Sequence, residues 1–163
     1  MTCKNPYIIG RCDEIDRLIA DALKWSDTDP KLGAHLAAYI SVLIVGIFED
    51  CIENLVAVRV KKANDPEIHN YITRIIDQRF RNPDYQKIST MLFDFSDEYR
   101  ASFKSKITPN GKEADSLQSL VDNKNALAHT GIASLTLTIG DVQSYYQHSM
   151  IILQELEQIL CNA

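Results

Sequence analysis

Hydrophobic positions recur every three or four residues along most of this chain, which is the spacing of one face of an α-helix. The first such stripe predicts an amphipathic helix of about 17 residues near the N-terminus. Its apolar positions are Ile8, Cys12, Ile15, Ile19 and Leu23. The polar segment SDTDP follows, where Asp27 or Asp29 is suited to cap the next helix and Pro30 to its first turn.

Residues 31–62 form the longest helical pattern, and its middle is apolar nearly all round. This pattern predicts a buried central helix. The most apolar stretch, AAYISVLIVGIFEDCI, is interrupted by Glu49 and Asp50 and falls short of the roughly 18 residues that cross a bilayer. The N-terminus lacks the extended apolar core of a signal peptide. Together these features predict a cytoplasmic protein without membrane contact.

Capping residues followed by proline mark two further helix starts, at Asp65-Pro66 and Asn82-Pro83. The second of these helices is expected to break near Phe95-Ser96. The segment TPNGK at 108–112 is typical of a loop. A helix over 113–129 follows, with an apolar side expected to face inward at Leu117, Leu120, Val121, Leu127 and Ala128.

The C-terminal part predicts one more helix, over residues 139–161. Before it, the β-branched segment at 131–141 is expected to be a connector or a short extended piece. Thr138 and Asp141 have the spacing of a capping box, although Glu or Gln is usual at the fourth position. No repeat or interdomain linker interrupts the chain. The sequence therefore predicts an all-α helical bundle, a single domain over 1–163, with one long central helix.

Composition narrows the classes of function. The chain has 163 residues, enough to bury a core, and a net charge of −5. That charge argues against general wrapping of nucleic acid but leaves room for a local basic cleft. The four cysteines are scattered without a CxxC pair, so we expect reduced thiols and no structural zinc.

Candidate chemistry is concentrated in NKNALAH at 123–129, since no GxGxxG, Walker loop, GxSxG or HExxH is present. Helical spacing places Asn125 and His129 on one face, with Lys124 about 140° round the axis. A proton acceptor, an amide and a cation suit RNA cleavage by the 2′-hydroxyl without a metal or cofactor. Spacing alone equally fits an ordinary polar helix face.

Three segments resemble a known family. AAYISVLIVGIFEDCIENLV, RFRNPDYQKI and LVDNKNALAHTG occur in the order seen in RiboL-PSP-like HEPN proteins, over roughly residues 32–160. The superfamily motif is an Arg, a polar residue that is often Asn, three further residues and a His. Its members are small α-helical proteins and often metal-independent endoribonucleases of toxin–antitoxin, abortive-infection and other anti-phage systems.

The resemblance implies a role for each residue of the motif. His129 would be the general base or acid, Asn125 would orient the phosphate or the histidine, and Lys124 takes the place usually held by Arg. It also implies a homodimer in which both motifs line one cleft, an RNA substrate, and an antitoxin or defence-system partner. A further departure is Thr130, which separates His129 from Gly131.

Lys124 keeps two other hypotheses open. A lysine preserves the positive charge but loses the planar fork that binds a phosphate through two bonds. The alternative function is therefore a non-catalytic HEPN module that binds RNA, a nucleotide or a partner protein. In a third hypothesis, the motif only packs a dimer interface in a helical interaction protein.

Three more residues in the resembling segments are candidates for substrate binding or support of the motif. Glu49 is expected either to orient Lys124 or His129, or to lie at the solvent edge of its helix. Arg79 and Arg81 offer a basic rim for RNA, or are solvated or ion-paired beside a helix cap.

Two tyrosines of the last predicted helix are also open to two interpretations. Tyr145 and Tyr146 suit either stacking on bases or packing in the core.

Overall fold

The computed structural model describes residues 3–130 and 137–161, apart from the side chains of Arg79 and Thr130. All regular elements in these residues are α-helices, so the all-α prediction is confirmed. The helices are α1 (Pro6–Ser26), α2 (Pro30–Lys61), α3 (Pro66–Arg79), α4 (Tyr85–Phe95), α5 (Asp97–Lys106), α6 (Lys112–Thr130) and α7 (Ile139–Cys161).

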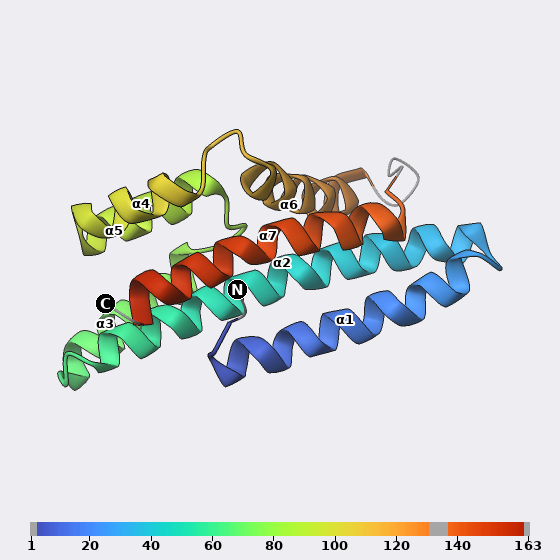
Figure 1. Cartoon of the computed structure of the whole chain (residues 1–163). Helices are drawn as coiled ribbons and strands as arrows, with labels where there is room; N and C mark the ends of the chain where they lie inside the picture. The colour runs from blue at the N-terminus through green and yellow to red at the C-terminus, as the bar shows by residue number, and fades with distance from the viewer. Residues whose placement is uncertain (1–2, 131–136, 162–163) are drawn as a thin grey trace.

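The long helix α2 is the centre of the bundle. It packs against α1, α3, α6 and α7, whereas α4 and α5 pack mainly against each other. Figure 1 shows α7 lying along α2, with α6 on one side of this pair and α1 on the other. In the described residues α1 and α6 do not pack against each other.

The apolar character of α2 is explained by its place in the core. Ile44, Phe48, Ile52 and Leu55 are fully buried along it. Contrary to the expectation from the sequence, α2 is by length and composition apolar enough to cross a membrane, but 56% of its most apolar 18-residue window is buried inside the protein. Such burial is expected of the central helix of a bundle, in which most sides of the helix contact other helices.

Three helices begin in the same way, with a side-chain cap followed by proline, at Asn5-Pro6, Asp29-Pro30 and Asp65-Pro66. The Asp29 carboxylate accepts hydrogen bonds from the backbone N–H groups of Lys31 and Leu32, both at 3.0 Å. Asp29 is thus the cap, and Asp27 is not. The Asn5 cap was not predicted, and it makes α1 longer than expected, at 21 residues.

The predicted start of the fourth helix at Asn82-Pro83 is wrong. The helix begins at Tyr85, and its cap is Asp84, whose side chain accepts a backbone hydrogen bond from the first turn. Asn82 has a φ of 51°, a left-handed conformation that Asn adopts more readily than most residues. The chain therefore turns at Asn82 instead of entering a helix there.

Two other predicted boundaries are confirmed. Ser96 ends α4, donating its N–H to the Leu92 carbonyl at 2.9 Å, and its hydroxyl caps α5 by accepting from Glu98. Thr138 and Asp141 form a reciprocal capping box with backbone-to-side-chain distances of 3.0 and 3.1 Å. Aspartate can therefore replace the usual glutamate at the fourth position of the box.

The inward side of α6 is narrower than predicted. Leu117, Leu120 and Val121 are buried and Leu127 is half-buried, but Ala128 is exposed. Ala128 lies about 100° round the helix from Leu127, which takes it past the edge of the apolar stripe. Residues 131–136 of the predicted connector lie outside the described part of the chain.

The two ends of the chain are joined by a buried carboxylate. Glu157 on α7 is 8% exposed and accepts hydrogen bonds from the backbone N–H groups of Lys4 and Asn5, at 2.5 to 3.1 Å. These donors lie at the start of α1, where N–H groups lack helical partners and the helix dipole favours a negative charge.

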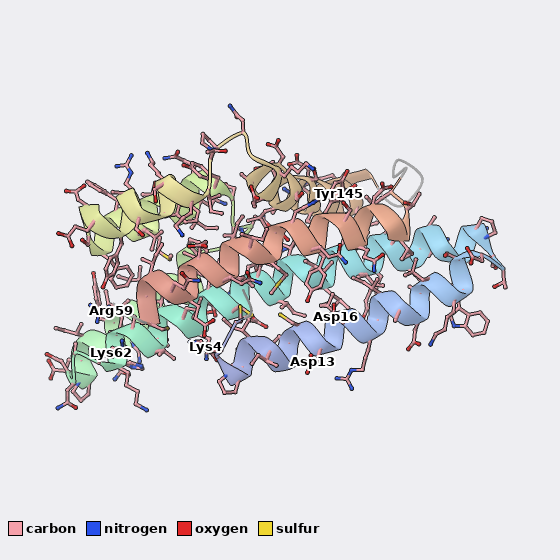
Figure 2. All side chains as sticks on the ribbon, in the orientation of Figure 1. Lys4, Asp13, Asp16, Arg59, Lys62 and Tyr145 are labelled. Atoms are coloured by element: carbon pink, nitrogen blue, oxygen red, sulfur yellow. The ribbon has the colours of Figure 1, made fainter. Side chains whose placement is uncertain are left out.

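Cations at the end of α2 also join neighbouring helices. Arg59 donates to the Tyr99 hydroxyl on α5 at 3.1 Å, and Lys62 donates to the Cys161 carbonyl at the end of α7 at 2.6 Å. Figure 2 shows both side chains at the C-terminal end of α2, away from the last turn of α6. These basic residues therefore hold the bundle together at the end distant from NKNALAH.

We expect Glu157→Ala to lower the free energy of unfolding by roughly 2–3 kcal/mol, because two backbone N–H groups at the start of α1 lose their charged acceptor. Urea unfolding measures the change. Glu14→Ala is the control, since Glu14 is exposed and its pair with Arg11 should contribute less than about 1 kcal/mol. Equal effects of the two substitutions would contradict this role of Glu157.

Candidate functional site

The three segments that resemble HEPN proteins meet at one carboxylate, that of Glu49. Lys124 on α6 lies with its Nζ 3.0 Å from Glu49 Oε1. The backbone N–H of Asn82, between α3 and α4, donates to the same oxygen at 2.7 Å. Arg81 Nη1 lies 3.5 Å from the other oxygen, Oε2. Segments more than 30 residues apart in sequence are thus joined at a single side chain.

Glu49 is an interior residue, with only 7% of its side chain exposed. Burying a carboxylate costs several kcal/mol unless it is paired and hydrogen-bonded, and here two cations and one N–H offset that cost. The solvent-edge alternative for Glu49 is therefore wrong. Its contact with Lys124 makes it an orienting residue for that cation, and substrate contact by Glu49 stays a prediction.

Lys124 and Arg81 differ in how much of their charge is available. The Lys124 side chain is 27% exposed and has Glu49 as its ion-pair partner. Arg81 is 55% exposed and lies within 4 Å of Asp77, Glu49 and Glu53. Arg81 is thus ion-paired, and three carboxylates weaken the positive potential that a basic rim would need. The side chain of Arg79 lies outside the described residues, so its role stays a prediction.

His129 and Asn125 extend the site along α6. His129 is exposed in the last turn, and Asn125 is half-buried one turn earlier on the same face. Lys124 precedes His129 by five residues, which corresponds to about 7.5 Å along the axis. The arrangement therefore presents an imidazole to solvent and holds an ammonium group inward, against Glu49.

Glu53, one turn after Glu49, belongs to the same cluster. Its Oε1 is buried, accepts no hydrogen bond from the described residues and lies 3.9 Å from Arg81. Burial raises the pKa of Glu53, and the nearby Arg81 lowers it in part. Glu53 was not among the predicted site residues, although its spacing of four residues from Glu49 puts both on one side of α2.

The backbone of Asn82 is the other site group that the sequence analysis missed. Its N–H points at Glu49 because the left-handed turn at Asn82 reverses the chain after α3. The available signal was Asn itself, which tolerates this conformation, directly before a proline, which disfavours a helical residue ahead of it.

The tyrosines of α7 belong to the packed interior. Tyr146 is 4% exposed and donates to the Cys12 carbonyl at 3.4 Å, while Tyr145 is half-buried against the core. Figure 2 shows Tyr145 on α7. Burial raises the pKa of Tyr146 far above its usual range and that of the Cys51 thiol to about 12. Neither group ionises near neutral pH.

Two further features of the structure bear on where a ligand could bind. No group of three or more His, Cys, Asp or Glu side chains within the described ranges is placed to hold a metal ion. A groove of about 580 Å³ lies between α3 and α4, with an apolar lining that includes Ile72, Ile75 and Met91. None of the candidate residues of the cluster lines this groove.

Comparison with known proteins gives one result. The family model described as RiboL-PSP-HEPN matches residues 8–162, which includes nearly all of the bundle and the whole cluster around Glu49. Neither the curated proteins nor the solved structures contain a match. Since the family model covers far more than half of the sequence, this chain belongs to the RiboL-PSP-HEPN family.

Proposed function

We propose that this protein is a metal-independent endoribonuclease of a bacterial defence or toxin-type system, acting in the cytoplasm. The observation that carries the proposal is an exposed His129 about one and a half turns from Lys124, which Glu49 holds in place. Membership of the HEPN superfamily suits a role as a ribonuclease or in nucleotide binding.

The reaction needs one base and one acid. His129 takes the proton from a ribose 2′-hydroxyl, whose oxygen attacks the adjacent phosphorus as the bond to the 5′ oxygen breaks. Lys124 stabilises the charge on the phosphoryl oxygens, and Asn125 orients the phosphate or the imidazole. The products are a 2′,3′-cyclic phosphate and a 5′-hydroxyl. A homodimer supplies a second His129, which protonates the leaving oxygen.

The pairing of Lys124 with Glu49 bears on the rate. Lysine binds a phosphate as a point charge, whereas arginine offers two parallel hydrogen bonds. A phosphate must also compete with Glu49 for the Lys124 ammonium, 3.0 Å from the carboxylate. The loss of two-bond phosphate binding and the competition with Glu49 both predict that this protein cleaves RNA more slowly than a protein whose motif carries arginine.

A second candidate function is a non-catalytic module that binds RNA, a nucleotide or a partner such as an antitoxin. The observation in its favour is that Lys124 and Arg81 both have carboxylate partners. In this case His129 contributes to binding and performs no proton transfer.

We expect wild-type protein to cleave RNA in the presence of EDTA and to leave cyclic-phosphate ends. His129→Ala should lower the rate at least about 100-fold, the usual contribution of a general base. His69→Ala, on α3, is the matched control and should retain the wild-type rate. Cleavage that survives His129→Ala would contradict the proposed mechanism.

Lys124→Arg should raise the cleavage rate, because it restores two-bond phosphate recognition at the same position. The measurement compares initial rates of wild type, Lys124→Arg and Lys124→Met at matched protein concentration, with the lowest rate expected for methionine. If all three proteins bind RNA but none cleaves any of a varied set of RNAs, the non-catalytic module replaces the nuclease.

Glu49→Gln should remove the negative charge that pairs with the neighbouring cations, so that their positive charge becomes available to RNA. The glutamine amide oxygen can still accept the hydrogen bond from the backbone N–H of Asn82. In a His129→Ala background, we expect tighter RNA binding and a steeper salt dependence, by roughly 0.7 in the log–log slope for each freed cation. Fluorescence anisotropy over a salt series measures both. Glu155→Gln, whose carboxylate lies 3.9 Å from Lys106, is the control. An unchanged slope would show that Glu49 does not restrain Lys124.

A further inference from the structure

Helix α3 carries an apolar stripe that the rest of the chain leaves partly uncovered. The stripe recurs at three- and four-residue spacing and consists of Ile68, Tyr71, Ile72, Ile75 and Ile76. None of these side chains is buried, and those of Ile68 and Tyr71 are 50% and 65% exposed. Among the described residues α3 packs against α2 only, and no contact with α4 closes the space between α3 and α4. The stripe is therefore open to a body outside this chain.

The groove of about 580 Å³ between α3 and α4 adjoins this stripe. Both helices lie at the left end of the bundle in Figure 1. One wall of the groove is the stripe itself, and the other consists of two rows on α4 at four-residue spacing. The inner row is Lys87, Met91 and Phe95, and the outer, exposed row is Gln86, Thr90 and Asp94. An apolar floor beside a polar rim is typical of protein interfaces.

The shape of the groove favours an elongated occupant. The stripe from Ile68 to Ile76 and the outer row from Gln86 to Asp94 each extend over eight residues, which is about 12 Å of helix. Ile68 and Tyr71 continue the apolar surface beyond the lining of the groove, where a compact small molecule would not cover them. A helix with apolar side chains at positions i, i+3 or i+4, and i+7 presents an apolar edge of about 10.5 Å, which matches this length.

The charge at the groove favours a basic helix. Asp94 lines the groove, and Asp97 and Glu98 follow it in the first turn of α5. All three carboxylates are exposed, and none has an ion-pair partner within the part of the chain that the structure describes. The cation of the lining, Lys87, instead donates to two backbone carbonyls of the α3–α4 connection, at 2.7 and 2.9 Å. The uncompensated charge is thus negative, and it attracts lysine or arginine.

We propose that the groove between α3 and α4, together with the adjoining stripe of α3, binds a basic amphipathic helix of a partner protein. The apolar side of that helix lies between α3 and α4, and a lysine or arginine of the partner pairs with Asp94. This inference is independent of the proposed function, because a nuclease and a non-catalytic module would present the same groove.

One end of the groove lies against the turn that supports the candidate site. Phe80 lines the groove and is 6% exposed, and Lys87 donates to the carbonyls of Arg81 and Asn82. Arg81 and the N–H of Asn82 are in turn partners of Glu49. Since a partner that binds only the folded form stabilises it, a helix in the groove should stabilise α3 and this turn together.

The test measures the binding of labelled synthetic helical peptides by fluorescence anisotropy. One set carries leucine, isoleucine or phenylalanine at positions i, i+3 or i+4, and i+7, with lysine on the polar side, and a second set has glutamate in place of each lysine. We expect saturable, micromolar binding of lysine peptides that weakens as salt rises, and weaker or no binding of glutamate peptides. Bound peptide should slow amide hydrogen exchange in α3.

Two variants at exposed positions locate the peptide without disturbing the core. Thr90→Arg places a long side chain over the groove and should weaken binding of lysine peptides at least about tenfold. Asp94→Lys should weaken it about threefold or more and improve binding of glutamate peptides. Gln118→Arg on α6 and Asp27→Lys after α1 are the matched controls, because both positions are exposed and distant from the groove, and they should bind as wild type does.

Three results would overturn the proposal: no binding by any lysine peptide, equal binding of the lysine and glutamate sets, or binding that persists in both Thr90→Arg and Asp94→Lys. A dimeric wild type that Thr90→Arg dissociates, measured by sedimentation velocity, would also overturn it by assigning the groove to a second copy of this chain. Each of these results leaves the RNA-cleavage test of the proposed function unaffected.

Discussion

The arrangement of this bundle around its candidate site depends on one buried carboxylate with three partners, two hydrogen-bond donors and a nearby guanidinium. Glu49 lies on the central helix, and its partners come from the α3–α4 connection and from α6. Because an unpaired carboxylate at 7% exposure is costly, these contacts stabilise the fold and hold the three segments close to one another. The same interaction that stabilises the fold therefore sets the position of the motif cation.

This interaction gives the two ionisable residues of the motif, Lys124 and His129, different surroundings. Lys124 is held by the interior, so its position is determined by the core, whereas His129 stands exposed at the helix end. An imidazole that must exchange protons with a substrate needs access, and a cation that must be in place beforehand benefits from a fixed anchor. In the proposed reaction, lysine in place of the motif's usual arginine would leave this division intact and would change the geometry of the phosphate contact.

The sequence was sufficient wherever the signal was local. Periodicity, the Asp29 and Asp65 caps, the break at Ser96 and the box at Thr138 are all set by residues within one turn of each other. The burial of Glu49 and its choice of partner could not be read in this way, because they depend on segments brought together only by tertiary packing. The error at Asn82 is different, because local signals were present: asparagine tolerates a left-handed backbone, and Asp84, two residues later, supplies the cap of α4.

Helix α3 packs less closely against the rest of the bundle than the other long helices do. None of its described side chains is buried, and it rests on α2 alone. Segments with few buried apolar contacts open at low free-energy cost, so α3 should exchange its amide hydrogens well before the core of α2 does. Yet α3 leads directly into the Arg81–Asn82 turn that binds Glu49. Local unfolding of α3 would thus withdraw two of the three partners of that carboxylate, making the position of the Lys124 cation sensitive to a helix with no buried side chain among those described.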